Sequence, residues 1–269
     1  MNRPVHLTSA DNPRVKAVVR LRKARERRKQ GAFVAEGLRE VSRAFDAGLE
    51  AHLLCTCDAL LDDAARQAVG QLIASRDVAH CTASEAVFRK MAYQQHPQGV
   101  LGVFATHRWT VADLPAAKDE LWLVAVGLSK PGNLGALARC ADAAGATALL
   151  IVDGVADVYN PNALRNSTGA VLTLPILDAD TPGALDLLRQ RGVRIVAAAL
   201  ERGRGYTDID LTPATALVIG AEDAGLPAAW RDAADAVATI PMRGRTADSL
   251  NASVAGALLL YEALRQRAR

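Results

Sequence analysis

The sequence predicts an α/β protein made of two α/β domains, and three observations indicate this. Strand-like and helix-like segments alternate over 1–106 and again over 120–269, a pattern typical of sheets covered by helices. Between these blocks, 107–119 is polar and carries a proline, which is typical of a linker. Continuous apolar runs such as 148–152 and 216–220 indicate strands that are buried on both faces. We therefore expect a small first domain, a linker, and a second domain with a parallel sheet.

The first block begins with apolar residues at helical spacing. Val15, Val18 and Leu21 predict a helix over 12–29, which Gly31 ends. After it, β-rich runs alternate with helical patterns. We expect strands over 32–36, 51–56, 77–82 and 99–106, and helices over 37–48, 58–74 and 83–92.

The second block holds longer apolar runs separated by glycine-rich turns. An apolar run bounded by turn residues predicts a buried strand, whereas the small residues of 132–146, with glycine near both ends, predict a helix. We expect strands over 120–128, 147–153, 171–177, 193–200, 214–222 and 236–242, and helices over 132–146, 182–191 and 249–267.

Composition narrows the class of protein. The charged fraction of 23% argues against global disorder. No apolar run approaches the ~18 residues needed to cross a membrane, and the N-terminus has no apolar signal-peptide core. The cysteines have neither zinc-site nor redox CxxC spacing; they are Cys55, Cys57, Cys81 and Cys140. We expect a reduced, cytoplasmic protein without metal.

Charge is distributed unevenly along the chain. Residues 1–45 carry twelve Lys or Arg and four acids, a net +8, while the rest carries a net −5. A cationic region of this density attracts polyanions, and the alternative is a solvated helix face. Because aromatic residues make up only 4% of the chain, phosphate and shape recognition is favoured over base stacking. The candidate residues for contact with nucleic-acid phosphates are Arg14, Lys16, Arg22, Arg25, Arg27 and Arg28.

Three loops rich in Gly, Asn or Ser follow apolar strands of the second block. They span 127–139, 220–227 and 241–253. Because ligands of open α/β sheets bind beyond the carboxyl ends of the strands, we expect the three loops to form one pocket. The two common nucleotide-binding fingerprints, GxGxxG and GxxxxGK[ST], are absent from the sequence.

Polar residues on two of the predicted helices have either a structural or a ligand-binding interpretation. Ser249 and Asn251 precede the apolar final helix, where they cap it, hold a ligand, or do both. Arg139 lies six residues after Asn133 on a helix of mostly small residues. Its side chain therefore reaches either a polar pocket, an interface or a surface ion pair.

These residues carry a resemblance to a known family. The stretches "PGNLGALARCADAAGA", "LVIGAEDAGLP" and "IPMRGRTADSLNASVAGALLLYE" resemble the three sequence motifs of SpoU/TrmH-type RNA 2′-O-ribose methyltransferases of the SPOUT superfamily. The resemblance covers roughly 120–266. The first block resembles the ribosomal-protein-like RNA-binding domain that precedes many such enzymes.

The resemblance implies a catalytic domain with a C-terminal trefoil knot, a homodimer, and S-adenosylmethionine as cofactor. It places Gly220, Ile240, Met242 and Leu250 at cofactor-contacting positions. The polar motif positions, and with them the candidate catalytic residues, are Asn133, Arg139, Glu222, Ser249 and Asn251. In the family the first-motif Arg is the proposed group for the 2′-hydroxyl. Because free Arg is always protonated, we expect Arg139 to steady a developing alkoxide or a phosphate.

Other segments match less closely. Arg165, in a segment over 160–171 that resembles a family stretch, reaches RNA phosphate, reaches across a dimer interface, or is a plain surface residue. Glu36 and Gly37 form a strand-to-helix turn that we interpret as structural. Lys130 stands where the family usually has Asp, and Cys140 where it usually has Thr.

The function expected from this resemblance is 2′-O-ribose methylation of RNA, with ribosomal RNA favoured over tRNA by family analogy. Three alternatives stay open at this point. They are a non-catalytic RNA-binding ribosome-assembly factor, a methyltransferase that confers antibiotic resistance by modifying rRNA, and an α/β enzyme for a small anionic substrate.

Overall fold

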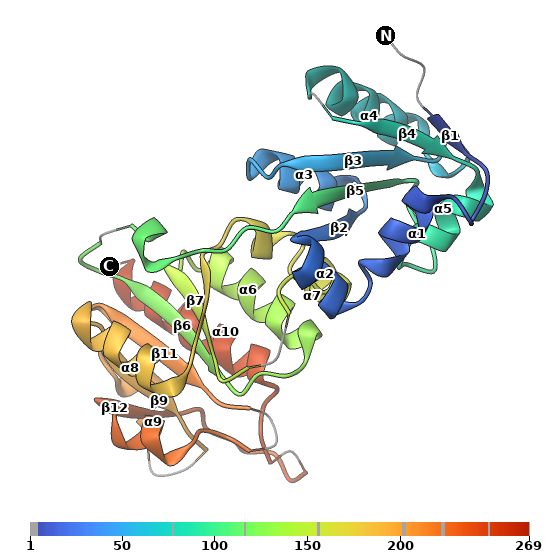
Figure 1. Ribbon diagram of the computed structural model, residues 1–269. Coiled ribbons are helices and arrows are strands. Elements are labelled where there is room, and N and C mark those ends of the chain that lie inside the picture. Colours follow the sequence, from blue (N-terminus) through green and yellow to red (C-terminus); the bar gives the residue numbers. More distant parts are fainter. Residues whose placement is uncertain are drawn as a thin grey trace. The chain divides into compact units, whose positions relative to one another are not determined.

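The computed structural model describes residues 5–76, 78–115, 117–154, 157–200, 203–221, 224–246 and 248–268. The chain divides into two compact units (Figure 1). The first comprises Met1–His107 and Tyr159–Leu172, and the second Arg108–Val158 and Thr173–Arg269. One segment from the middle of the second block, Tyr159–Leu172, thus belongs to the first unit.

The first unit contains a five-stranded mixed sheet in the order β1-β4-β3-β5-β2. The strands are β1 (Val5–Leu7), β2 (Ala32–Glu36), β3 (Ala51–Thr56), β4 (His80–Ala83) and β5 (Val100–Ala105). Strands β1, β4 and β3 are parallel, whereas β5 is antiparallel to both β3 and β2. The helices are α1 (Pro13–Arg20), α2 (Ala24–Gln30), α3 (Leu38–Asp46), α4 (Asp63–Ser75), α5 (Glu85–Met91) and α7 (Pro161–Asn166).

The helix predicted over 12–29 is two helices. Helix α1 starts at Pro13, where the Asn12 side chain accepts a hydrogen bond from Arg14 N at 2.9 Å, and the chain leaves the helix after Arg20. A helix end leaves carbonyls without intrahelical partners. Here Arg27 Nη1 donates to Leu21 O at 2.7 Å and to Arg22 O at 2.8 Å. The break is therefore stabilised by a side chain from the next helix.

The second unit contains a seven-stranded parallel sheet in the order β10-β12-β9-β11-β6-β7-β8, which confirms the expected parallel sheet. The strands are β6 (Leu121–Val126), β7 (Ala148–Val152), β8 (Ile176–Ala179), β9 (Arg194–Ala198), β10 (Arg204–Gly205), β11 (Thr215–Ile219) and β12 (Ala236–Thr239). The helices are α6 (Pro131–Ala143), α8 (Thr181–Gln190), α9 (Ala228–Asp232) and α10 (Ala252–Arg267).

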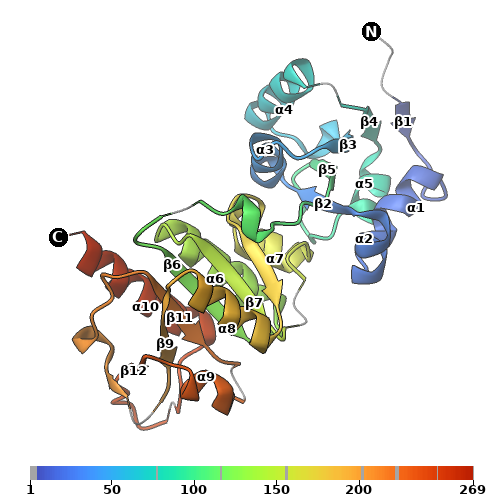
Figure 2. The same cartoon turned by 60° about the vertical axis from the view of Figure 1, so that its left-hand side comes forward.

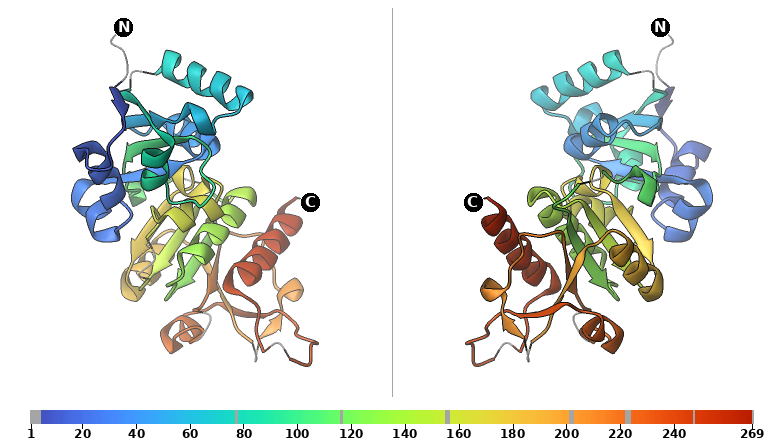
Figure 3. Two further views of the ribbon diagram at one scale, coloured as in Figure 1. Left: turned by 90° about the vertical axis from the view of Figure 1, so that its right-hand side faces the viewer. Right: turned by 90° about the vertical axis from the view of Figure 1, so that its left-hand side faces the viewer.

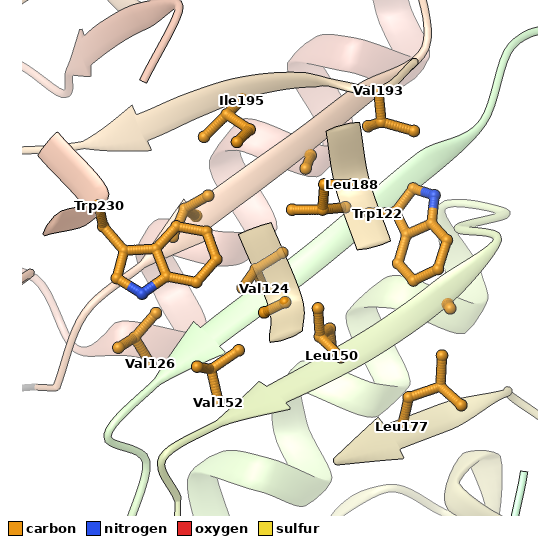
Figure 4. Close-up of a cluster of buried hydrophobic side chains, with 14 of the residues drawn as sticks. Trp122, Val124, Val126, Leu150, Val152, Leu177, Leu188, Val193, Ile195 and Trp230 are labelled. Carbon is orange, nitrogen blue, oxygen red and sulfur yellow. The ribbon is translucent and has the colours of Figure 1, made fainter. Parts of the chain in front are cut away.

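Helices cover both faces of this sheet (Figures 2 and 3). On one face, Trp230 of α9 and Leu188 of α8 pack in a buried cluster with strand residues such as Val124 (Figure 4). On the other face, α6 packs against α10. Gly256 of α10 lies so close to α6 that an added Cβ would stand 2.7 Å from Leu137 Cδ2. The missing side chain therefore lets the two helices approach closely.

One predicted strand has the wrong bounds, and two short helices were not predicted. The apolar run predicted as a strand over 171–177 forms a 3₁₀ turn over Ala170–Leu172, and β8 begins only at Ile176. Residues Val171 and Leu172 are nevertheless buried, so their apolar character reflects burial of an irregular segment. Helices α7 and α9 were not predicted, because each is too short for a helical period to show. No helix in the described ranges has both the length and the apolar character needed to cross a bilayer.

A buried ion pair holds the start of strand β6, which lies between β11 and β7. The Glu120 carboxylate accepts hydrogen bonds from Arg191 Nε at 2.9 Å and from Trp122 Nε1 at 2.7 Å. The Glu120 side chain is 5% exposed and that of Arg191 is 19% exposed. Burial raises the pKa of Glu120, but the hydrogen bonds from Arg191 and Trp122 and the Arg191 charge outweigh it, so this pKa lies below its ordinary value.

Glu120→Gln is expected to lower the free energy of unfolding by about 2 kcal/mol at pH 7. The figure lies below the cost of breaking a fully buried pair because Arg191 is partly exposed. Since the folded-state pKa is lowered, the wild-type advantage exists above the pKa of an unfolded Glu, about 4.3. It disappears as the pH falls through the lower folded-state pKa. Urea unfolding of both proteins at pH 7 and near pH 3 measures this difference.

The matched control is Glu85→Gln, which removes the exposed pair of Glu85 with Arg89. This change is expected to shift stability by less than about 0.5 kcal/mol at either pH. Equal stability of Glu120→Gln and the wild type at pH 7 would contradict the role given to the pair.

Candidate functional site

The carboxyl ends of three strands in the second unit surround a pocket of about 850 Å³. Its walls come from Ala198–Leu200 at the end of β9, from the turn after β11, and from the segment between β12 and α10. These strands are parallel and β9 lies between β11 and β12, so their carboxyl ends meet at one edge of the sheet. The volume is within the range common for small-molecule sites.

The structure brings the four candidate cofactor residues together. Gly220, Ile240, Met242 and Leu250 all line the pocket, and Ser249 lines it too. Two of the three loops expected to form one pocket therefore do so. The loop over 127–139 supplies none of the pocket's described lining residues; Ala198, Ala199 and Leu200 take that place.

The turn after β11 is shaped by a close approach of backbone to backbone. A Cβ added to Gly220 would stand 2.3 Å from Gly225 C and 2.6 Å from Leu226 N. Gly225 itself adopts a φ of 64°, and Ala221 and Gly225 form a β-bridge. The chain thus doubles back on itself in a way that only glycine at position 220 allows. Glu222 lies outside the described residues.

The pocket wall is mostly apolar. Arg231 is the single charged side chain among the described lining residues, and Leu200, with 59% of its surface exposed, lies at the rim. Neither residue was predicted: Arg231 lies on the short helix α9, and Ala198–Leu200 at the end of β9 have only small or apolar side chains and no motif. The one signal that could have found it is the placement of β9 beside β11, which a sequence pattern does not reveal.

The start of α10 confirms the capping interpretation for Asn251 and corrects it for Ser249. Asn251 Oδ1 accepts hydrogen bonds from Ser253 N at 2.9 Å and Ser253 Oγ at 2.6 Å, as an N-cap does. Asn251 Nδ2 also donates to Asn133 Oδ1 at 3.3 Å. Ser249 does not cap the helix, since α10 begins at Ala252 and Ser249 faces the pocket instead.

Asn133 and Asn251 therefore connect the starts of α6 and α10, which are 118 positions apart in the sequence. Arg139 lies farther along α6 and is exposed. Within the described part of the chain it makes no hydrogen bond or ion pair, so the surface ion pair considered above is not found there. Arg139 is also not a lining residue of the pocket.

The candidate RNA-binding residues lie in the first unit. Five of them are exposed, namely Arg14, Lys16, Arg22, Arg25 and Arg28. Arg165, on α7, is exposed in the same unit and borders the same small hollow as Arg22. Arg27 is the exception: it is 2% exposed and donates to backbone carbonyls. We therefore assign Arg27 to the structure of the α1–α2 break and withdraw it from the RNA-contacting set.

Glu36 closes a loop of the first unit. Its carboxylate accepts hydrogen bonds from Tyr93 N at 2.7 Å and from Gln94 N at 3.3 Å. Burial raises the pKa of Glu36, and the two backbone hydrogen bonds oppose that shift. This geometry supports a structural role. In the described ranges, no three His, Cys, Asp or Glu side chains gather as a metal site would require.

Two family models match the chain. That of the SpoU rRNA Methylase family matches residues 120–261, and that of the MRM3-like substrate binding domain matches residues 12–102. Among curated proteins, the 23S rRNA (guanosine(2553)-2′-O)-methyltransferase RlmP of Bacillus subtilis is 30% identical over 95% of this chain and 97% of its own length. The 23S rRNA (uridine(2479)-2′-O)-methyltransferase of Streptomyces viridochromogenes is 33% identical over 90% of this chain and 85% of its own.

Solved structures agree with these matches. A crystal structure of an RNA 2′-O ribose methyltransferase is 41% identical, with a TM-score of 0.88 over 98% of this chain and 100% of its own. The AdoMet-bound rRNA methyltransferase of Sinorhizobium meliloti is 30% identical, with a TM-score of 0.87 over 98% of both chains. Since a family model covers more than half of the chain and relatives above 30% identity align along nearly all of it, the chain belongs to the SpoU rRNA methylase family.

Proposed function

We propose that this protein transfers a methyl group from S-adenosylmethionine to a ribose 2′-hydroxyl of ribosomal RNA. The observation that carries the proposal is the pocket at the carboxyl ends of β9, β11 and β12, which the second and third motifs line. The relatives with the matching chain length act on 23S rRNA according to their names, and a structural neighbour has AdoMet bound.

The pocket residues fit such a cofactor. Apolar side chains of Ile240, Met242 and Leu250 suit a flat adenine ring, and the bare backbone at Gly220 leaves room for a ligand to approach the chain. S-adenosylmethionine supplies an electrophilic methyl group on a sulfonium. The wall holds no described carboxylate or thiol that would compete as a methyl acceptor.

The chain's own contribution to the chemistry is positioning and charge. A 2′-hydroxyl is a weak nucleophile, and holding it in line with the methyl carbon contributes up to about 7–11 kcal/mol in well-oriented systems. Arg139, exposed and without an ionic partner in the described ranges, is available to offset the charge that develops on the hydroxyl oxygen or to hold an adjacent phosphate. Asn133 and Asn251 fix the starts of the two helices that flank this region.

The exposed basic residues of the first unit provide contacts to the RNA backbone. Contacts to phosphates give affinity that does not depend on the RNA sequence. These residues therefore bind the RNA but do not determine which nucleotide is methylated. Ribosomal RNA is favoured over tRNA because both curated relatives described above, which match both units of this chain, are named as 23S rRNA enzymes. A cytoplasmic location follows from that substrate.

A homodimer is proposed through α10. Four large apolar side chains follow one side of this helix and are exposed; they are Val254 (47%), Leu258 (37%), Tyr261 (50%) and Leu264 (38%). A second copy of the chain is the proposed occupant, as the family resemblance implies. The same resemblance supports a trefoil knot formed by the C-terminal segment, which contributes Ile240, Met242, Ser249 and Leu250 to the pocket wall before α10 packs on α6.

Gly220→Ala is expected to weaken S-adenosylmethionine binding by about tenfold or more. The added Cβ meets backbone atoms of Gly225 and Leu226, which no side-chain rotation can move away, so the turn must open. Isothermal titration with the cofactor measures the affinity. Gly70→Ala is the control, since nothing lies within 4 Å of its added Cβ. Unchanged affinity of Gly220→Ala would separate this turn from cofactor binding.

Arg139→Ala is expected to lower methyl transfer to ribosomal RNA by about 10²-fold or more, because one charge-stabilising donor is worth that much. Cofactor affinity should stay near the wild-type value, since Arg139 does not line the pocket. Tritium transfer from labelled cofactor gives the rate and isothermal titration gives the affinity. The control is Arg189→Ala, an exposed arginine on α8. Wild-type turnover by Arg139→Ala would exclude this residue from the mechanism.

Replacing both Leu258 and Tyr261 by Glu is expected to convert a dimer into a monomer of 28.4 kDa. Two charges at the centre of the apolar strip cannot be buried without partners. Light scattering coupled to size-exclusion chromatography measures the mass. Val111→Glu, at another exposed apolar residue of the second unit, should leave the dimer intact. A wild-type protein that elutes with the mass of one chain at micromolar concentration would refute the interface.

A further inference from the structure

Tyr93 is an exposed aromatic residue in an unusual setting. Of the eleven Phe, Trp and Tyr side chains, all of which lie in the described ranges, only Tyr93 and Tyr261 are exposed, at 48% and 50%. Tyr261 belongs to the apolar strip of α10. Tyr93 instead lies in the first unit, in the segment between α5 and β5, among exposed arginines.

The position of Tyr93 is held from three directions. Its backbone N–H donates to Glu36 Oε2 at 2.7 Å. Arg22 Nη2 donates to the carbonyls of Lys90 and Ala92, just before it in the chain. Asn162 Nδ2, from α7, donates to Tyr93 Oη at 3.3 Å. A ring that is fixed before binding loses little conformational entropy when a ligand covers it.

Cations from two distant parts of the sequence border the same place. Arg22 follows α1 and Arg165 lies on α7, yet both line the small hollow that Tyr93 also lines. Both arginines are exposed. The acidic groups there are Glu36, which accepts the backbone hydrogen bonds described above, and Glu40, which is buried and pairs with Arg39. The exposed charges around the ring are therefore positive.

The size of the hollow limits what it accepts. Its volume is about 30 Å³, which is room for one water molecule and far too little for a base. A planar ligand must therefore lie on the exposed surface of the ring rather than inside the hollow. A half-exposed aromatic ring flanked by arginines is the arrangement by which proteins stack unpaired bases and hold the phosphates on either side.

We propose that Tyr93 is a stacking platform for one unpaired base of the substrate RNA, with Arg22 and Arg165 contacting the neighbouring phosphates. This rests on the proposed RNA methyltransferase function and adds a preference for single-stranded RNA over a duplex. It also gives the segment Tyr159–Leu172 a role in RNA binding, because Asn162 and Arg165 both come from it.

The test compares Tyr93→Leu with Tyr93→Phe in the full-length protein. Leu keeps an apolar side chain but has no π face, whereas Phe keeps the ring and loses only the hydroxyl. The probe is a fluorescein-labelled single-stranded RNA of mixed sequence and about 12 nucleotides, within the site sizes common for such binding. A duplex of the same sequence is the second probe, and anisotropy gives both affinities.

Tyr93→Leu is expected to weaken single-strand binding by roughly 5- to 150-fold, the range that corresponds to losing one base–aromatic stack. Duplex binding should change little, and Tyr93→Phe should retain most of the single-strand affinity. Tyr206→Leu, a tyrosine of the second unit, is the control. If the Leu variant weakens both probes equally, or the Phe variant weakens single-strand binding as much as Leu, the stacking role is refuted.

Arg165→Glu provides an independent test, because it leaves Tyr93 and the segment around it unchanged. Loss of one phosphate contact should reduce the slope of log affinity against log salt by about 1. A slope equal to that of the wild type refutes the phosphate contact. Wild-type protein that methylates ribosomal RNA but does not bind the single strand refutes the stacking proposal alone and leaves the proposed function standing.

Discussion

Parallel pairing of the strands in the second unit is the constraint on which the site depends. In a parallel sheet every carboxyl end faces the same edge, so the segments after β9, β11 and β12 meet there although they are far apart in the sequence. The contact of Gly220 with the backbone of Gly225 and Leu226 then shapes one wall. The Glu120–Arg191 pair stabilises the start of β6, the strand next to β11.

Sequence motifs predicted the parts of the site where local chemistry is specific. Gly220 and the residues of the third motif can be recognised in the sequence, because glycine and polar residues that follow an apolar strand are typical of a ligand-binding turn. Ala198–Leu200 could not be found in this way. Their contribution depends on which strand lies beside β11, and that is a property of the sheet order rather than of the residues.

In the first unit, the sequence pattern likewise predicted the charge of a region but not the orientation of each side chain. The cationic stretch correctly predicted a largely exposed basic region, but a charge run does not reveal which member turns inward. Arg27 does, because the chain breaks after α1 and leaves two carbonyls that its guanidinium can reach. Similarly, low aromatic content made base stacking an unattractive hypothesis, whereas the structure shows that one of the few rings is fixed in place and exposed.

The grouping of Tyr159–Leu172 with the first unit has a consequence for how this protein can be divided. The backbone passes from one unit to the other at three places, near 107, 158 and 172. No single cut yields two self-sufficient halves. A fragment starting at Arg108 would contain Ala163, Leu164 and Val171 without the rest of the first unit. These apolar side chains are 0–3% exposed in the intact chain and would lose the unit that buries them. A chimaera that replaces the first unit of such an enzyme must therefore replace Tyr159–Leu172 together with Met1–His107.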